Sequence, residues 1–342
     1  MSLRVLSPGL LTTVQDGGRH GFGAIGVGAA GAMDPVSLRL ANLLVGNAQD
    51  AAALEITLRG PRLRCEADLL IAIAGAEIDA RRDAEAVPLW RPVLLRAGSE
   101  LHLGGMRRGA RAYLAIAGGI GLPAVLGSRA NDVNAGLGPM PRPLVAGDSL
   151  PCAPAPRSLC GAMWKRLESA AADEDADARN VFSTNWSLDP RAWFDVDAAH
   201  PIRAIAGTHF ARLDGDSQRA LFGAEFRIGV DSNRVGCRLE GVPIALAAPI
   251  ELVSEGAAPG TVQLPPGGVP IALTAEAPPT GGYPRIAQII AIDLPRLAQR
   301  RPGDRVRFAE TDIADAQTRY LERERALARL AEHVHWRLRQ DW

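Results

Sequence analysis

The run Leu69-Leu-Ile-Ala-Ile-Ala74, followed by Gly75, decides the fold class of this chain. A short, wholly apolar run that stops at a glycine is typical of a buried β-strand. Outward from it, further strand candidates lie at Pro92-Val-Leu-Leu-Arg96, at Arg111-Ala-Tyr-Leu-Ala-Ile-Ala117 and at Ile202-Arg-Ala-Ile-Ala206, each with a glycine at or soon after its end. Many short strands separated by glycine and proline favour β-barrels or sandwiches over a parallel α/β sheet.

Helical signals are fewer. Asp34 can cap a helix that starts at Pro35 and ends before Gly46, since proline suits the first helical position and glycine suits the position after the end. A second helix is predicted over about residues 311–340, with an apolar stripe for the core or a subunit contact. The residues of this stripe are Tyr320, Leu327, Leu330, Val334 and Leu338.

The pattern predicts two β domains. Strand-like patterning fills residues 1–152 and resumes over residues 200–310. Between them, residues 153–199 are interpreted as a linker or surface excursion, with the acidic run Asp173-Glu-Asp-Ala-Asp177 inside it. Residues 311–342 form the predicted helical tail.

Composition excludes several classes of protein. The 342 residues carry 38 basic and 38 acidic side chains, so net charge points neither to nucleic acid nor to an anionic membrane. Aromatic residues are only 5%, which weakens a base-stacking function. No apolar run reaches the roughly 18 residues that span a bilayer, and the first residues lack a signal-peptide pattern. We therefore expect a cytoplasmic protein without a nucleic-acid or membrane partner.

The number and spacing of lysine, cysteine and histidine residues argue against several kinds of site. Lys165 is the only lysine, so a Walker A site and a Schiff-base lysine are not expected. Lys165 also does not directly follow Met163, as it would in a biotin-attachment sequence, so any biotin would be carried by a partner protein. The four cysteines form no CxxC pair and the six histidines show no ligand spacing, so no metal site is expected.

Two polar, glycine-rich clusters point to a small-molecule site. The first is Thr12-Thr-Val-Gln-Asp-Gly-Gly-Arg19 with Gly31-Ala-Met-Asp34. The second follows the strand-like run that starts at Glu251 and includes Thr280-Gly-Gly-Tyr-Pro-Arg-Ile286. Polar side chains on turns set by glycine suit the lining of a pocket. The two clusters are expected to face one site.

These clusters belong to a longer series of ordered motifs. They include Gly9-Leu-Leu-Thr-Thr-Val-Gln-Asp-Gly-Gly-Arg19, Leu54-Glu-Ile-Thr-Leu-Arg-Gly-Pro61, Ser232-Asn-Arg-Val-Gly-Cys-Arg-Leu239 and Thr280-Gly-Gly-Tyr-Pro284. Over residues 3–310 the chain resembles the KipA-type family, also known as the C subunit of 5-oxoprolinase, allophanate hydrolase subunit 2 or the biotin-dependent carboxyltransferase domain family. The resemblance implies a mainly β fold of tandem cyclophilin-like β-barrel domains with a few helices and a C-terminal helix.

The chain departs from the family pattern beside its second cluster. Pro278 and Pro279 stand where the family usually has Gln and Thr, which removes two polar side chains and two backbone donors. Arg285 stands where the family usually has Lys. It keeps the positive charge but is no proton acceptor.

The resemblance implies one component of an ATP-dependent hydrolase that opens the lactam of 5-oxoproline to glutamate. Its partners would be a KipI-like B subunit and a LamB/YcsF-type A subunit, and ATP could bind together with them. Two alternatives stay open: a carboxyltransferase of the urea carboxylase kind that uses carboxybiotin carried by a partner, and a non-enzymatic KipA-type binder of a kinase inhibitor.

Both enzymatic chemistries need fixed donors around a developing negative charge and a carboxylate nearby. The catalytic candidates are Asp16, Glu255 and Tyr283. The substrate-binding candidates are Gln15, Arg19, Glu55, Arg234, Gln263, Thr280, Gly281, Gly282 and Arg285. Other roles stay open for some of them, since Glu55 could satisfy buried backbone donors and the glycines could serve tight turns alone.

Overall fold

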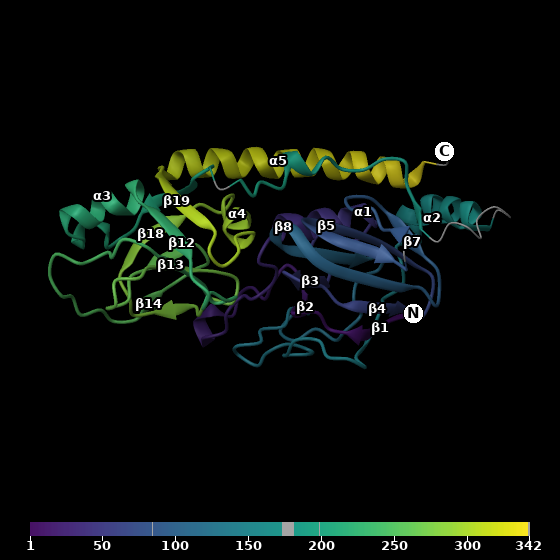
Figure 1. Cartoon of the computed structure of the whole chain (residues 1–342), viewed down its shortest axis with the longest axis horizontal. Coiled ribbons are helices and arrows are strands. Elements are labelled where there is room, and N and C mark those ends of the chain that lie inside the picture. Colours follow the sequence, from purple (N-terminus) through teal and green to yellow (C-terminus); the bar gives the residue numbers. More distant parts are fainter. Residues whose placement is uncertain (84, 173–180, 198, 341–342) are drawn as a thin grey trace. The chain divides into compact units, whose positions relative to one another are not determined.

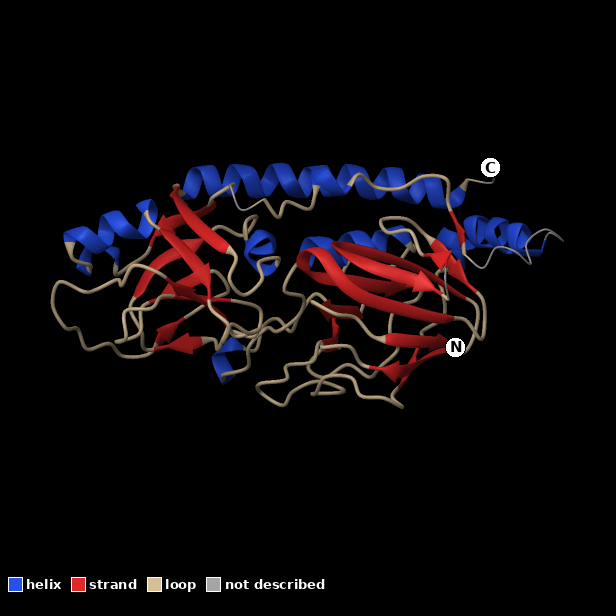
Figure 2. Ribbon diagram, viewed as in Figure 1, coloured by secondary structure: helices blue, strands red, loops and turns tan. Residues whose placement is uncertain are grey.

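The chain consists of two compact units. The computed structural model describes residues 1–83, 85–172, 181–197 and 199–340. The first unit comprises Met1–Gly18, Asp34–Asp195 and Leu327–Trp342, and the second comprises Arg19–Met33 and Val196–Ala326. Strands dominate both units, helices are few, and a long helix ends the chain (Figures 1 and 2). The predicted mainly β fold with a C-terminal helix is confirmed.

The first unit is built on a ten-stranded sheet. Seven of its strands follow the order β10-β7-β5-β8-β4-β1-β9, and the other three, β2, β3 and β6, pair off this path. Its strands are β1 (Ser2–Ser7), β2 (Leu11–Gln15), β3 (Ala53–Thr57), β4 (Arg62–Cys65), β5 (Leu69–Arg82), β6 (Glu85–Ala86), β7 (Val93–Leu95), β8 (Glu100–Ile116), β9 (Ser149–Pro151) and β10 (Phe182–Ser183). The register places Thr13 opposite Glu55 on β3, and Glu55 opposite Tyr113 on β8.

The sequence predicted that the strand starting at Leu69 ends at Gly75, and this end is wrong. Strand β5 begins at Leu69 as expected but continues through Gly75 to Arg82, paired with β8. Gly75 has φ +91°, and a Cβ there would lie 2.6 Å from the carbonyl oxygen of Arg111. The pairing register shifts just after Gly75, so the glycine allows a bulge in a long strand where the sequence suggested a stop.

Helix α1 (Pro35–Leu44) covers this sheet by packing on β5 and β8. The predicted start is confirmed, since the Asp34 carboxylate accepts hydrogen bonds from the backbone amide (3.0 Å) and the hydroxyl (2.6 Å) of Ser37. Leu40 and Leu44 are completely buried against the sheet, and burying each such side chain contributes about 1.5–3 kcal/mol.

The second unit is a closed barrel with the order β11-β18-β15-β16-β13-β12-β19. Its strands are β11 (Ile202–Ala206), β12 (Glu225–Ile228), β13 (Gly236–Glu240), β15 (Thr261–Gln263), β16 (Ile271–Leu273), β18 (Arg285–Ile289) and β19 (Arg305–Glu310). A separate two-stranded sheet joins β14 (Glu255–Gly256) to β17 (Thr280–Gly281). Phe226 and Phe308 meet in the barrel core with ring centroids 6.1 Å apart.

The remaining helices range from single turns to the long α5. They are η1 (Gly23–Ile25), α2 (Arg157–Ala172), η3 (Pro190–Ala192), η4 (Phe210–Arg212), α3 (Gly215–Gly223), α4 (Leu294–Ala298) and α5 (Ile313–Arg339). Helix α5 confirms the predicted C-terminal helix, and Leu327, Val334 and Leu338 of the predicted stripe are buried. The acidic run 173–177 lies outside the described residues. Among the helices that are described, none combines the length and the apolar character that a membrane crossing requires.

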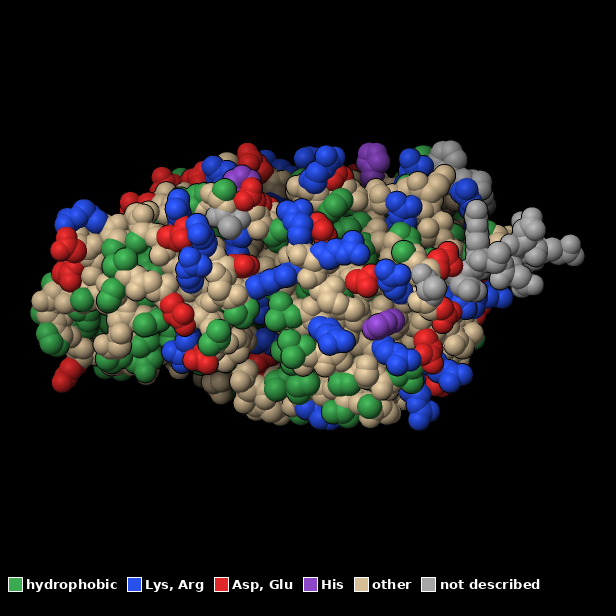
Figure 3. Space-filling model, in the orientation of Figure 1, with side chains coloured by type: hydrophobic (Ala, Val, Ile, Leu, Met, Phe, Trp, Pro, Cys, Tyr) green, Lys and Arg blue, Asp and Glu red, His purple; other side chains and the backbone are tan. Residues whose placement is uncertain are grey.

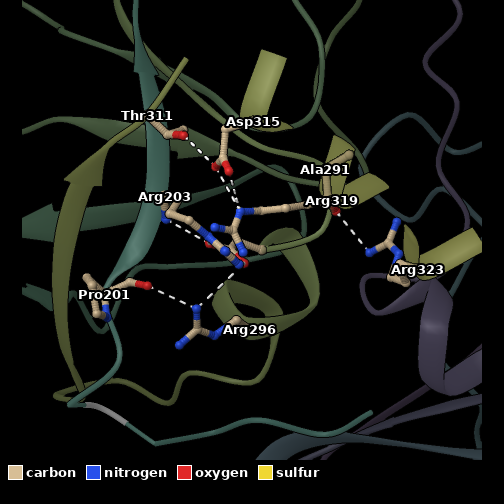
Figure 4. A network of polar contacts seen from close by, with 9 residues as sticks. Pro201, Arg203, Ala291, Arg296, Thr311, Asp315, Arg319 and Arg323 are labelled. Carbon is tan, nitrogen blue, oxygen red and sulfur yellow. Dashed lines mark hydrogen bonds and ion pairs between the residues drawn. The ribbon is translucent and has the colours of Figure 1, made fainter. Parts of the chain in front are cut away.

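Arginine–carboxylate pairs tie α4 to the barrel and also form within the start of α5 (Figure 4). Arg203 of β11 donates to both carboxylate oxygens of Asp293, at 2.9 and 2.7 Å, and its backbone amide donates as well. Arg319 of α5 donates to both oxygens of Asp315 at 2.8 Å. The hydrogen bond to Asp293 raises the pKa of Arg203, which keeps this cation charged.

Candidate functional site

Asp16 follows β2 in the first unit and is only 7% exposed. Its Oδ1 accepts hydrogen bonds from the amide of Gly18 (2.8 Å) and the hydroxyl of Ser128 (2.7 Å), and its Oδ2 accepts from the amide of Arg129 (2.5 Å). Three donors on one carboxylate fix the loop at residues 128–129 to the end of β2. This geometry favours an anchoring role for Asp16, and its catalytic role stays a prediction.

Gln15 is fully buried one residue earlier. Its Nε2 donates to the hydroxyl of Thr13 (3.0 Å) and to the carbonyl of Asn131 (2.8 Å). The Oε1 of Gln15 and the Nδ2 of Asn131 are buried and find no hydrogen-bond partner among the described residues. An acceptor and a donor in two contacting residues suit a small polar molecule that offers both groups.

Glu55 lies in the interior of the same sheet at 1% exposure. It accepts a hydrogen bond from the phenol of Tyr113 (2.7 Å), and that phenol accepts one from the amide of Asp34 (2.7 Å). Burial, reinforced by the charge of Glu55, raises the pKa of Tyr113 well above its ordinary value. Glu55 therefore acts within a buried polar chain, and Tyr113 is a member that sequence reasoning treated only as part of a strand.

The second unit holds the other candidate residues. Glu255 opens β14, Gly281 lies opposite it on β17, and Arg285 opens β18. The guanidinium of Arg285 forms an ion pair with the Glu255 carboxylate and donates to the carbonyl of Gly256 at 3.2 Å. The side chains of Arg285 and Glu255 are 29% and 47% exposed, so the pair is accessible to a ligand.

Gln263 lies opposite Arg285 in the barrel wall and is 6% exposed. Its Nε2 is buried and donates to no other described residue. A Cβ on Gly281 would lie 2.4 Å from this nitrogen, so the side-chain amide rests directly on the glycine. Gly281 is thus explained by close packing, and Gln263 offers an unused donor beside the Glu255–Arg285 pair.

Tyr283 and Gly282 line a cavity of about 640 Å³ next to this strand pair. Tyr283 is 47% exposed, and Thr280 is also exposed on β17. The remaining wall is almost entirely apolar, and it consists of Pro243, Ile244, Ala245, Leu246, Pro249, Ile250, Leu264, Pro265, Pro266, Gly267, Gly268 and Pro284. A cavity of this size and character is typical of ligand sites.

Arg19 and Arg234 differ from the other candidates because both are buried, at 1% and 4% exposure. Arg234 forms an ion pair with the fully buried Glu276 at 2.5 Å and donates to the carbonyl of Gly31 at 2.6 Å. These contacts hold the glycine-rich segment Arg19–Met33 within the second unit. They favour a structural role for Arg234, and substrate binding by either arginine stays a prediction.

His209 is a candidate that sequence reasoning missed. Its Nδ1 accepts a hydrogen bond from the backbone amide of Arg285 at 3.1 Å, and its own amide donates to the Arg285 carbonyl at 2.9 Å. Because Nδ1 is an acceptor, the neutral ring carries its proton on Nε2. This contact could not be predicted from the sequence, because His209 and Arg285 are 76 positions apart and no motif links them. As for metals, no cluster of three or more His, Cys, Asp or Glu side chains fit to bind one occurs in the part of the chain that the structure describes.

The comparisons with known proteins agree with this architecture. The family described as "Carboxyltransferase domain, subdomain A and B" matches residues 25–310. The C subunit of 5-oxoprolinase from Escherichia coli (strain K12) is 37% identical over 334 residues, which cover 97% of this chain and 99% of that protein.

Solved structures show the same fold. The K. lactis urea amidolyase superposes with a TM-score of 0.81 at 26% identity, over 95% of this chain and 20% of that one. The protein TTHA0988 superposes with a TM-score of 0.72 at 32% identity, over 90% of this chain and 55% of that one. This chain therefore spans about a fifth of the first structure and about half of the second. Together with the nearly full-length match to the Escherichia coli protein, the family match shows that this chain belongs to the KipA-type family of 5-oxoprolinase C subunits, which carries the carboxyltransferase domain.

Proposed function

We propose that this chain is the C subunit of a 5-oxoprolinase-like hydrolase that opens the lactam of 5-oxoproline to glutamate. The observation that carries the proposal is the 37% identity to the C subunit of Escherichia coli 5-oxoprolinase over 97% of this chain. A match that also spans 99% of the relative supports a shared role for the whole chain. The KipI-like B subunit and the LamB/YcsF-type A subunit are its proposed partners, and we expect the chain to be inactive without them.

The chemistry of the second unit fits a lactam. Attack of water on the lactam carbonyl carbon places negative charge on the carbonyl oxygen, and fixed donors stabilise that charge. The buried Nε2 of Gln263 is such a donor. Arg285 offers a cation for the carboxylate of 5-oxoproline, and Glu255 offers a carboxylate that can orient the water and accept its proton.

ATP is a co-substrate in this proposal. The only lysine of the chain, Lys165, lies on α2 of the first unit and does not belong to a glycine-rich phosphate loop. We therefore propose that ATP binds with the partner subunits, and none of the steps assigned to this chain's residues uses it.

Reconstitution tests the proposal. The chain is mixed with its purified partner subunits, ATP and 5-oxoproline, and glutamate is measured with each protein omitted in turn. Glutamate that forms only when all proteins are present supports the hydrolase. An assembled complex that leaves 5-oxoproline unchanged would falsify it.

The family match and the urea amidolyase structure favour carboxyl transfer as the second candidate. Here a partner protein would carry the biotin, because Lys165 follows Trp164 and lacks a biotin-attachment sequence. This candidate predicts carboxylation of urea or a related amide when the chain is supplied with a biotin carboxylase and a biotinylated carrier. Binding to a partner without turnover in either assay would favour the KipA-type binder.

A further inference from the structure

Arginines are abundant in this chain, so charge alone does not single out Arg285. Figure 3 shows basic and acidic side chains spread together over the face of the molecule that it presents. Arg285 is held in two places. Its guanidinium is held by Glu255 and by the carbonyl of Gly256, and its backbone is held by His209. A guanidinium binds a carboxylate best through two parallel hydrogen bonds, so whatever fixes its direction bears on substrate binding.

The backbone at Arg285 contains a β-bulge. Val262 of β15 lies opposite Ala287, but the next residue of β15, Gln263, lies opposite Arg285. Ile286 is therefore an extra residue on β18. A bulge bends its strand and redirects the side chains beside it. The direction of the Arg285 side chain therefore depends on the contacts that hold this bulge in place.

The chain that follows β11 supplies these contacts. The amide of Gly207 donates to the carbonyl of Ile286 at 2.9 Å, and the amide of His209 donates to the carbonyl of Arg285 at 2.9 Å. The Nδ1 of His209 accepts a hydrogen bond from the amide of Arg285 at 3.1 Å. A Cβ on Gly207 would lie 2.6 Å from the carbonyl carbon of Ile286, so the glycine permits this close approach. The side chain of His209 thus completes a pair of hydrogen bonds to the backbone of Arg285.

We propose that His209 is a positioning residue, which holds the bulge at Arg285 so that the guanidinium is directed at the carboxylate of the substrate. The inference rests on the proposed function, in which Arg285 binds the carboxylate of 5-oxoproline. In this role His209 acts through Arg285, and a side chain packed around a binding group in this way keeps its geometry fixed.

The atom that His209 uses determines which substitutions preserve the role. Nδ1 is an acceptor bonded to Cγ, and the Oδ1 of an asparagine is an acceptor bonded to the same atom. His209→Asn therefore keeps the hydrogen bond to the amide of Arg285. His209→Phe keeps a ring but has no acceptor, so it leaves that amide without its partner.

Nitrogen-15 NMR of the chain alone reports on Arg285 directly. The arginines are labelled, and the signal that disappears in Arg285→Lys is the Nε–H of Arg285, a buried group. We expect its order parameter to be high in the wild type and in His209→Asn, and to fall towards about 0.6, the value of a flexible group, in His209→Phe. An Arg285 side chain that stays equally ordered in His209→Phe overturns the proposal.

The kinetics of the reconstituted complex test the link to substrate binding. The carboxylate of 5-oxoproline is present in the ground state and the transition state alike, so a misdirected Arg285 should raise KM with little change in kcat. We expect His209→Phe to raise KM about tenfold and His209→Asn to restore the wild-type value. The control is His102→Phe, since His102 is exposed on β8 of the first unit, and its KM should not change. A wild-type KM in His209→Phe contradicts the positioning role.

A double variant distinguishes action through Arg285 from a general effect on the fold. Arg285→Met removes the cation, so the addition of His209→Phe should raise KM no further. Effects of the two substitutions that multiply independently contradict a role through Arg285. Urea unfolding checks that each variant is folded, and His209→Ala, which removes the acceptor without adding bulk, repeats the test where His209→Phe does not fold.

The outcomes separate this proposal from the proposed function. A complex that converts 5-oxoproline with an unchanged KM after His209→Phe removes the positioning role and leaves the hydrolase standing. A complex without 5-oxoproline turnover, in which the order of the Arg285 side chain still depends on the acceptor at residue 209, removes the hydrolase and keeps the positioning role.

Discussion

Gly281 shows how a single missing side chain shapes the candidate site. A Cβ at this position would lie 2.4 Å from the Nε2 of Gln263, a distance that real contacts do not reach. We expect Gly281→Ala to push aside the amide end of the flexible Gln263 side chain, at a cost of less than about 1 kcal/mol in the free energy of unfolding, and to lower the rate of glutamate formation by the reconstituted complex. The control is Gly256→Ala on the paired strand, where nothing lies within 4 Å of the added methyl group. Urea unfolding and glutamate formation by the reconstituted complex are measured for both variants, and equal rates of glutamate formation contradict this packing.

Tyr113 predicts a pH dependence. Burial and the neighbouring Glu55 raise its pKa well above the ordinary value of 10.0. The folded chain therefore keeps the phenolic proton at a pH where the unfolded chain has lost it. This stabilisation is complete below pH 10 and is lost as the pH rises above it. Urea unfolding across this range should show a falling free energy of unfolding, and Tyr113→Phe should make the fall shallower. A slope that is equal in both proteins contradicts the assignment.

At this scale the sequence predicted which residues belong to the candidate site better than it predicted which residues contact one another. Gln263, Gly281 and Arg285 were predicted from a glycine-rich motif, and the structure brings them together with Glu255. The contact of His209 with Arg285 was not predictable, because 76 residues separate the two and no periodic pattern links them. The roles of the candidate residues stay predictions until variants are measured.

At the scale of elements, the ion pair between Arg203 and Asp293 fixes α4 to the barrel. Asp293 is 1% exposed and Arg203 is 24% exposed. Removal of one partner leaves the other charge poorly solvated, so Asp293→Ala should lower the free energy of unfolding by about 3–5 kcal/mol. The control pair is Asp216 with Arg219, whose side chains are 94% and 76% exposed. Asp216→Ala should change the stability by less than about 1 kcal/mol. Comparable losses of unfolding free energy in both variants would refute the claim that the buried pair contributes more to stability than the exposed pair.

The elements also show where local patterns fail. Apolar runs correctly predicted β7 and the second half of β8, because a buried strand needs continuous apolar residues. The strand-like pattern at Ile202 also correctly predicted β11, which is partly buried. The same rule predicted too early an end for β5. In sequence, a glycine that permits a bulge, such as Gly75, looks the same as a glycine that ends a strand. The strand-like run at Glu251 remains unpaired over residues 251–254 in the described chain, because pairing depends on a neighbouring strand as well as on the sequence itself.

At the scale of the whole molecule, the two units are not continuous in sequence. Arg19–Met33 packs within the second unit, where the buried Arg234 donates to Gly31, and residues 327–340 pack within the first. The β content, the barrel and the terminal helix were predictable, because patterning and motifs run along the chain. The exchange of segments between units was not, because it depends on contacts between residues far apart in sequence. Whether the two polar clusters face one site stays a prediction.

The most direct test of the site assigned to the second unit is the rate of glutamate formation from 5-oxoproline by the complex reconstituted with Gln263→Leu. The matched control is Gln317→Leu, since Gln317 is a more exposed glutamine on α5, away from the barrel wall. We predict that the Gln263 variant loses about 10²–10³-fold in kcat with little change in KM, as expected for a donor to a developing oxyanion, while the Gln317 variant keeps the wild-type rate. A Gln263 variant that forms glutamate at the wild-type rate would contradict the role of Gln263 as the donor to the oxyanion.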